Sequence, residues 1–77
     1  MNWRERIVVD PAVSHGKACI KGSRVMVSVL LDNLAAGEPA EAIVRAYHLE
    51  AQDITAALLY AAELAKERHV SLTSASD

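Results

Sequence analysis

"EAIVRAYHLEAQDI", residues 41–54, contains two helical patterns with a break between them, and the expected architecture follows from it. The interruption at "HLE" predicts a short helix and a longer one, separated by only three or four residues. A short helix, a tight break and a longer helix are typical of the helix-turn-helix. The apolar positions that would lock two such helices together are Ile43, Tyr47, Leu49 and Ile54. A helical corner used only for packing has the same pattern, so both interpretations stay open.

One further helix is expected before this pair. In "SVLLDNLAAG", residues 28–37, Ser28 can cap the first turn and Gly37 can end the last one. Apolar residues at helical spacing mark the face that this helix would bury: Val27, Leu30, Leu31 and Leu34. We therefore expect helices over residues 28–36, 39–46 and 51–68, followed by a flexible polar tail over 71–77.

The first 27 residues predict strands rather than helices. "RIVV", residues 6–9, is a short β-branched run that ends at Asp10-Pro11. "ACI" and "RVMV" flank Lys21-Gly22-Ser23, where Gly22 can supply the positive φ of a tight hairpin turn. The expected fold is mainly α with a small N-terminal β-hairpin. It is a three-helix, helix-turn-helix (homeodomain-like) domain preceded by two or three short strands, within residues 1–70.

The composition predicts a small core. A chain of 77 residues is a single domain, and a domain this short buries only about 60% of its unfolded surface. Hydrophobic residues make up 52% of the chain, but aromatic residues make up only 4% and Phe is absent. Because the core must then be built from Ala, Val, Leu and Ile, we expect a homodimer in which a second copy completes it.

The sequence argues against an enzyme, a cofactor or a metal centre. In "SHGKACIKGSRV", residues 14–25, five residues separate Gly16 from Gly22, whereas a P-loop has four. Cys19 and His15 have no third group to orient them as nucleophile and base, and the three histidines are scattered. We therefore expect no catalytic, cofactor-binding or metal-binding residues.

A cytoplasmic location is expected, with no membrane association. Cys19 is the only cysteine, so no internal disulfide can form, which suits a reducing compartment. No apolar run approaches the roughly 18 to 20 residues that cross a bilayer, and the first residues do not resemble a signal peptide.

Charge is divided unevenly along the chain. Residues 1–24 carry five cations and two acids, a net charge of +3, and residues 25–77 carry three cations and eight acids, a net charge of −5. A mixed, solvated surface would produce this pattern. A basic segment that binds an anionic partner would produce it as well.

The 41–54 corner offers a small set of candidates for reading DNA. Gln52 could bond to adenine and Thr55 could contact a thymine methyl group, with Arg45 and His48 beside them. Phosphate contacts dominate affinity for DNA, however, and this segment is acidic overall. DNA binding and simple packing therefore both remain possible roles for the corner.

A series of motifs runs through the chain in a fixed order. They are Ile7, Asp10-Pro11, Gly16-Lys17, Ile20-x-Gly22-Ser23-Arg24-Val25, Gly37, Ile43, Tyr47-x-Leu49, Asp53-Ile54 and Leu58-x-Tyr60-Ala61. In order and spacing they resemble the bacterial domain-of-unknown-function 433 family. Glu50 departs from the pattern, because a capping Ser or Thr is usual there, and we expect this to weaken the helix start by up to about 1 kcal/mol.

Members of that family are similar to VapB-type antitoxins. The resemblance implies a helix-turn-helix domain, dimerisation and a PIN-like ribonuclease toxin as partner. We expect a non-enzymatic antitoxin-like protein that binds such a toxin and could also bind its own operator DNA. A PIN-like active site is acidic, so basic residues could block it, and the candidates are Arg4, Arg6, Lys17, Lys21 and Arg24. The alternative is a stand-alone helix-turn-helix regulator, or a dimeric structural module that does not bind DNA.

Overall fold

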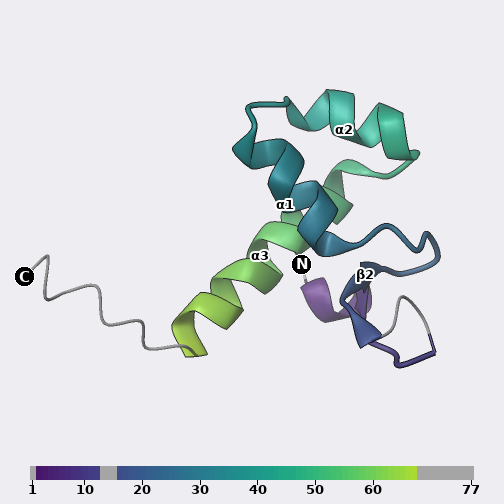
Figure 1. Ribbon diagram of the computed structural model, residues 1–77, viewed down its shortest axis with the longest axis vertical. Helices are drawn as coiled ribbons and strands as arrows, with labels where there is room; N and C mark the ends of the chain where they lie inside the picture. Colours follow the sequence, from purple (N-terminus) through teal and green to yellow (C-terminus); the bar gives the residue numbers. More distant parts are fainter. Residues whose placement is uncertain (1, 13–15, 68–77) are drawn as a thin grey trace, which may run out of the picture.

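The computed structural model describes residues 2–12 and 16–67. The elements in chain order are a 3-10 turn η1 (Trp3–Glu5), strands β1 (Ile7–Val8) and β2 (Cys19–Ile20), and helices α1 (Val27–Ala35), α2 (Ala40–Tyr47) and α3 (Ala51–Glu67) (Figure 1). The expected fold, three helices after a small β-hairpin, is confirmed. The helix bounds lie within one residue of those expected, while position 68 and the 71–77 tail lie outside the described residues.

The two strands form a small antiparallel sheet. Ile7 pairs with Ile20 and Val8 pairs with Cys19, while Cys19 also forms a single bridge with Met26. Between β2 and that bridge the chain turns, and Gly22 has the predicted positive φ of 82°. The expected tight turn at residues 21–23 is therefore confirmed, with two strands and one bridging residue.

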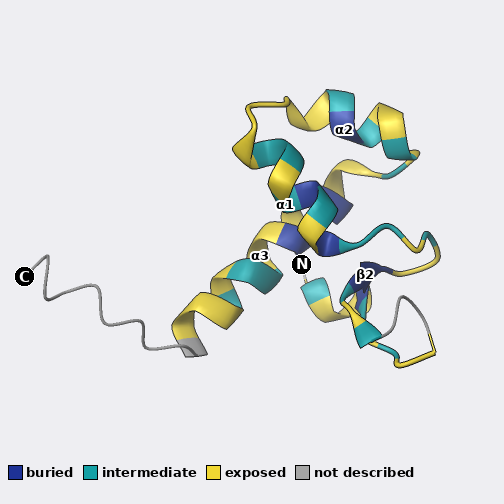
Figure 2. Ribbon diagram, viewed as in Figure 1, coloured by how far each residue is buried: buried dark blue, intermediate teal, exposed yellow. Residues whose placement is uncertain are grey.

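The hydrophobic core lies where the three helices meet the sheet (Figure 2). Its buried members come from every major element: Ile7, Ile20, Val27, Leu30, Ile43, Ile54, Ala56 and Ala57. Trp3 and Tyr60 close one edge of this core, with ring centroids 5.3 Å apart in an edge-to-face arrangement. The C-terminal half of α3 then projects away from α1, α2 and the sheet (Figure 1).

The two ends of α1 differ in how well the sequence predicts them. Gly37 has φ of 92°, and its N–H donates to the Leu34 carbonyl at 3.0 Å, while the Glu38 N–H donates to the Asn33 carbonyl at 3.0 Å. These two bonds form the Schellman motif that glycine favours, so the expected role of Gly37 is confirmed. The expected cap by Ser28 is wrong, because α1 starts one residue earlier, after Met26, and the Val27 N–H donates to the Ala18 carbonyl at 2.9 Å instead.

Candidate functional site

The corner between α2 and α3 is made by three residues, 48–50. His48 ends α2 in the left-handed conformation, with φ of 57°, and its N–H donates to the Val44 carbonyl. The N–H of Leu49 donates to the same carbonyl at 3.0 Å. A left-handed conformation costs a residue with a Cβ about 1–2 kcal/mol. His48 therefore has a backbone role in the turn, whatever its exposed imidazole contacts.

The start of α3 is fixed by Asp53. Its Oδ2 accepts the N–H of Glu50 at 2.9 Å, and its own N–H donates to the Glu50 carbonyl at 2.9 Å. This is the second half of a capping box, in which the side chain three residues into the helix bonds back to the capping residue. The missing Ser or Thr at position 50 is thus compensated in part, and the three-residue spacing from Glu50 to Asp53 is the sequence signal for it.

Arg6 joins both of these acids. Its Nη1 lies 3.0 Å from Glu50 Oε1 and 3.0 Å from Asp53 Oδ1. Hydrogen bonds to Glu50 and then Asp53 raise the pKa of the Arg6 guanidinium above its ordinary value, because they stabilise its charged form. Asp53 is buried, with 7% of its surface exposed, whereas the side chain of Glu50 is 68% exposed. We call this group the Arg6–Asp53 cluster; it ties the chain between η1 and β1 to the start of α3.

A shallow hollow of about 250 Å³ lies beside this cluster. It is lined by Glu5, Arg6, Lys21 and Asp53, so charges of both signs face it. Since Arg6 and Asp53 already satisfy each other, Lys21 is the lining cation without an ion pair among the described residues.

The five candidate partner-binding cations therefore divide into two groups. The guanidinium of Arg4 lies 4.4 Å from the centre of the Trp3 ring, and Arg6 belongs to the Arg6–Asp53 cluster. The other three are exposed and make no ion pair within the part of the chain that the structure describes: Lys17, Lys21 and Arg24. We call these three residues the hairpin cations.

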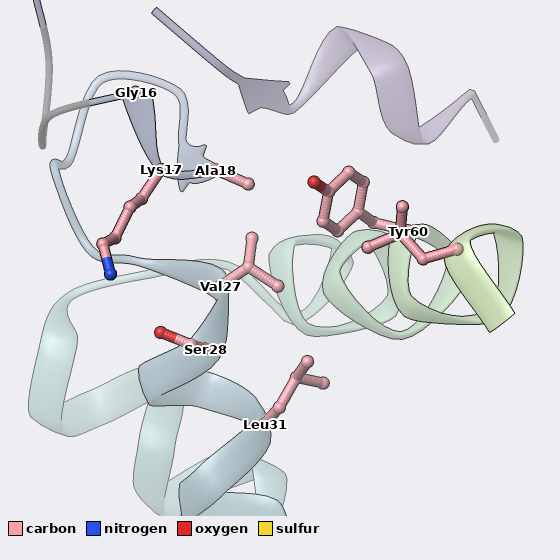
Figure 3. Close-up of a pocket in the computed structure, with 8 residues that line it drawn as sticks. Gly16, Lys17, Ala18, Val27, Ser28, Leu31 and Tyr60 are labelled. Atoms are coloured by element: carbon pink, nitrogen blue, oxygen red, sulfur yellow. The ribbon is translucent and has the colours of Figure 1, made fainter. Parts of the chain in front are cut away.

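The turn that carries two of the hairpin cations, Lys21 and Arg24, is held by its own hydrogen bonds. The Ser23 hydroxyl donates to the Ile20 carbonyl at 2.9 Å and accepts the Val25 N–H at 3.0 Å. The Lys21 N–H donates to the Arg6 carbonyl at 2.8 Å, and Arg24 adopts a positive φ of 63°. The Lys17 side chain extends away from Tyr60, on the far side of a groove of about 680 Å³ between residues 16–18, α1 and α3 (Figure 3). The charged groups thus stand on a defined backbone.

The DNA-reading candidates all lie at the α2–α3 corner and are exposed: Arg45, His48, Gln52 and Thr55. The exposed side of α3 continues with Leu58 and Leu59, which are 48% and 39% exposed. No cation follows Gln52 on α3 until Lys66, near its C-terminal end. The exposed side of this helix is therefore apolar where a DNA-reading helix needs donors and positive charge.

Two kinds of site are not found in the described ranges. No group of three or more His, Cys, Asp or Glu side chains there could hold a metal ion. None of the helices described is long and apolar enough to cross a membrane. Cys19 is buried, and His15, its potential catalytic partner, lies outside the described residues.

Comparison with protein families gives one match, over residues 7–61, to the family described as a protein of unknown function, DUF433. The matched segment runs from β1 to the middle of α3, so it includes the turn, the Arg6 partners and the α2–α3 corner. Neither the curated proteins nor the solved structures give a match.

Proposed function

Since the chain belongs to the DUF433 family, we propose that it is a non-enzymatic, cytoplasmic antitoxin-like protein that forms a homodimer and binds an acidic partner, a PIN-like ribonuclease toxin. The observation that carries this proposal is the separation of the cations into two groups. Arg6 is neutralised by Asp53 and Glu50, whereas the hairpin cations have no acidic partner among the described residues.

The hairpin cations suit a surface that blocks an acidic active site. Two of them, Lys21 and Arg24, stand on one short turn, and Lys17 precedes the strand that leads into it. Because the Ser23 hydroxyl bonds to the backbone on both sides of the turn, little conformational entropy would be lost on binding. At physiological ionic strength charges attract over about 8 Å, so each hairpin cation would contribute where it comes within that distance of an acidic group of the toxin.

Co-purification with the toxin from the adjacent reading frame tests this proposal. The triple variant Lys17→Glu, Lys21→Glu, Arg24→Glu should lose the complex, since three attractive charges become repulsive. Arg45→Glu is the matched control, because Arg45 is also an exposed cation, on α2. Equal recovery of toxin with both variants would remove the hairpin cations from the interface.

Operator binding through the α2–α3 corner is the second candidate. The three-residue turn and the exposure of Gln52 and Thr55 support it, and the apolar side chains of Leu58 and Leu59 count against it. Gel shifts with the upstream DNA at several salt concentrations test it, because phosphate-dominated binding weakens steeply with salt. A shift at low salt that Gln52→Ala weakens would support this role, and no shift at any salt concentration would exclude it.

A further inference from the structure

The solvent-facing side of α3 carries a regular pattern that the core does not use. Six exposed residues fall within an arc of about 100° on this helix at 3.6 residues per turn. They are Ala51, Thr55, Leu58, Leu59, Ala62 and Lys66. We call this set the α3 face. Leu58 and Leu59, at its centre, leave 48% and 39% of their surface exposed, although burying such side chains is favourable.

The α3 face has nearly the same order of side-chain sizes from either end of the helix. Two leucines lie at its middle, and small side chains stand three positions away on either side, Thr55 before Leu58 and Ala62 after Leu59. If a second copy of the helix runs antiparallel about an axis between the leucines, Leu58 meets Leu59 and Thr55 meets Ala62. A twofold interface requires this kind of self-complementary surface. We propose that the chain forms a twofold dimer in which the α3 faces of two copies pack antiparallel.

Charge at the two ends of α3 selects the antiparallel direction. Glu50, immediately before α3, has a side chain that is 68% exposed, and Lys66 is exposed in the last turn. Antiparallel packing brings Lys66 of one copy to the end of the partner's α3 that carries Glu50, whose carboxylate also bonds to Arg6. Parallel packing would place like charges together and align the two helix dipoles, and both effects are unfavourable.

The shape of the chain leaves room for this partner. The C-terminal half of α3 projects beyond the other helices and the sheet (Figure 1), and all six residues of the α3 face are exposed. In the antiparallel pair the projecting half of each helix lies against the first half of its partner. The dimer thereby buries the leucines that a single copy leaves exposed.

This inference specifies the interface of the homodimer in the proposed function and rests on that part of it, but it does not rest on the proposed toxin, because the hairpin cations are not part of the α3 face. It does bear on DNA binding. Thr55 belongs to the α3 face and Gln52 stands beside it, so a dimer through this face covers both residues. A dimer of this kind and DNA reading by α3 therefore exclude each other.

Sedimentation equilibrium of the full chain and of single variants tests the interface. The wild type should be a dimer at micromolar concentration, and Leu58→Glu should raise the dimer Kd by about 100-fold or more, because each dimer would bury two carboxylates against leucine. Leu64→Glu is the control, since Leu64 is 42% exposed on the same helix but faces the groove beside Leu31. Ala62→Glu provides a second disruption in case Leu58→Glu loses its helical circular dichroism signal.

Cysteine crosslinking tests the direction. Gln52 and Ala65 are both exposed and would lie at the same level along the antiparallel pair, whereas two copies of Gln52 would lie about 20 Å apart along the axis. A short bismaleimide should therefore link a mixture of Gln52→Cys and Ala65→Cys chains, but neither variant alone. Cys19 is buried and should react little.

Three results would overturn the inference: a monomeric wild type, a dimer that survives both glutamate substitutions, or crosslinking of Gln52→Cys chains to one another. A monomer whose operator gel shift is lost in Gln52→Ala would instead assign this side of α3 to DNA.

Discussion

Asp53 and Glu50 stand three residues apart at the start of α3, and both contact Arg6, but the structure predicts very different consequences for replacing them. Asp53 is 7% exposed and accepts the Glu50 N–H, whereas the Glu50 side chain is 68% exposed and contributes one ion pair with Arg6. Asp53→Ala removes a helix-capping contact worth about 1 kcal/mol and leaves the Glu50 N–H without its bond. The hydrogen bond from Arg6 to Asp53 is also lost, and charge-assisted bonds of this kind are worth about 1.5–3 kcal/mol, so the total loss should be about 2.5–4 kcal/mol.

Glu50→Ala should change the free energy of unfolding by less than about 0.5 kcal/mol, because water screens an exposed ion pair. Asp53→Asn keeps an oxygen for the Glu50 N–H but loses the negative charge. Its loss in free energy of unfolding should therefore lie between those of Glu50→Ala and Asp53→Ala. Urea denaturation followed by far-UV circular dichroism, at one fixed protein concentration, measures all three variants. If Glu50→Ala costs as much as Asp53→Ala, the assignment of the helix start to the buried carboxylate is wrong.

Three further substitutions probe the backbone and the aromatic edge. His48→Gly should stabilise the chain by up to about 1 kcal/mol in urea denaturation, because glycine adopts the left-handed conformation without strain; a loss of stability would show that the imidazole makes a stabilising contact. Gly37→Ala should destabilise the chain by about 1 kcal/mol through its φ of 92° alone, since no atom lies within 4 Å of the added Cβ; an unchanged denaturation midpoint would contradict this. Trp3→Leu should lower the free energy of unfolding by at least about 0.5–1.5 kcal/mol, which is the contribution of an edge-to-face contact such as the one with Tyr60. Tyr60→Leu should then destabilise the Trp3→Leu chain less than it destabilises the wild type, and equal losses would show that the two rings do not interact.

The parts of the fold that depend on local chemistry could be predicted from the sequence. Gly37 and Gly22 stand at positive φ because few other residues adopt that conformation cheaply, so their positions mark a helix end and a turn. The start of α1 was harder to predict, since the Val27 N–H is satisfied by the Ala18 carbonyl, next to β2, rather than by Ser28. A local capping rule cannot anticipate a partner supplied by another element.

Long-range contacts were the part that the sequence did not predict. Arg6 and Asp53 are separated by 47 positions, and only the folded chain brings them together. Trp3 meets Tyr60 through η1, a turn that no pattern in the first residues predicts. The total charge of residues 1–24 could be counted from the sequence, but which of those cations lacks an acid nearby could not. Pairing with acids removes Arg6 from the candidate set of five, and the contact of Arg4 with the Trp3 ring separates Arg4 from the three hairpin cations.

The most direct test of the account is a titration of the neighbouring toxin's ribonuclease activity with the purified chain. The account predicts inhibition that saturates at a fixed stoichiometry, that weakens as salt is raised, and that Arg24→Glu diminishes while Arg45→Glu does not. Full ribonuclease activity in the presence of excess folded chain, or inhibition that Arg24→Glu and its two lysine counterparts leave unchanged, would contradict it.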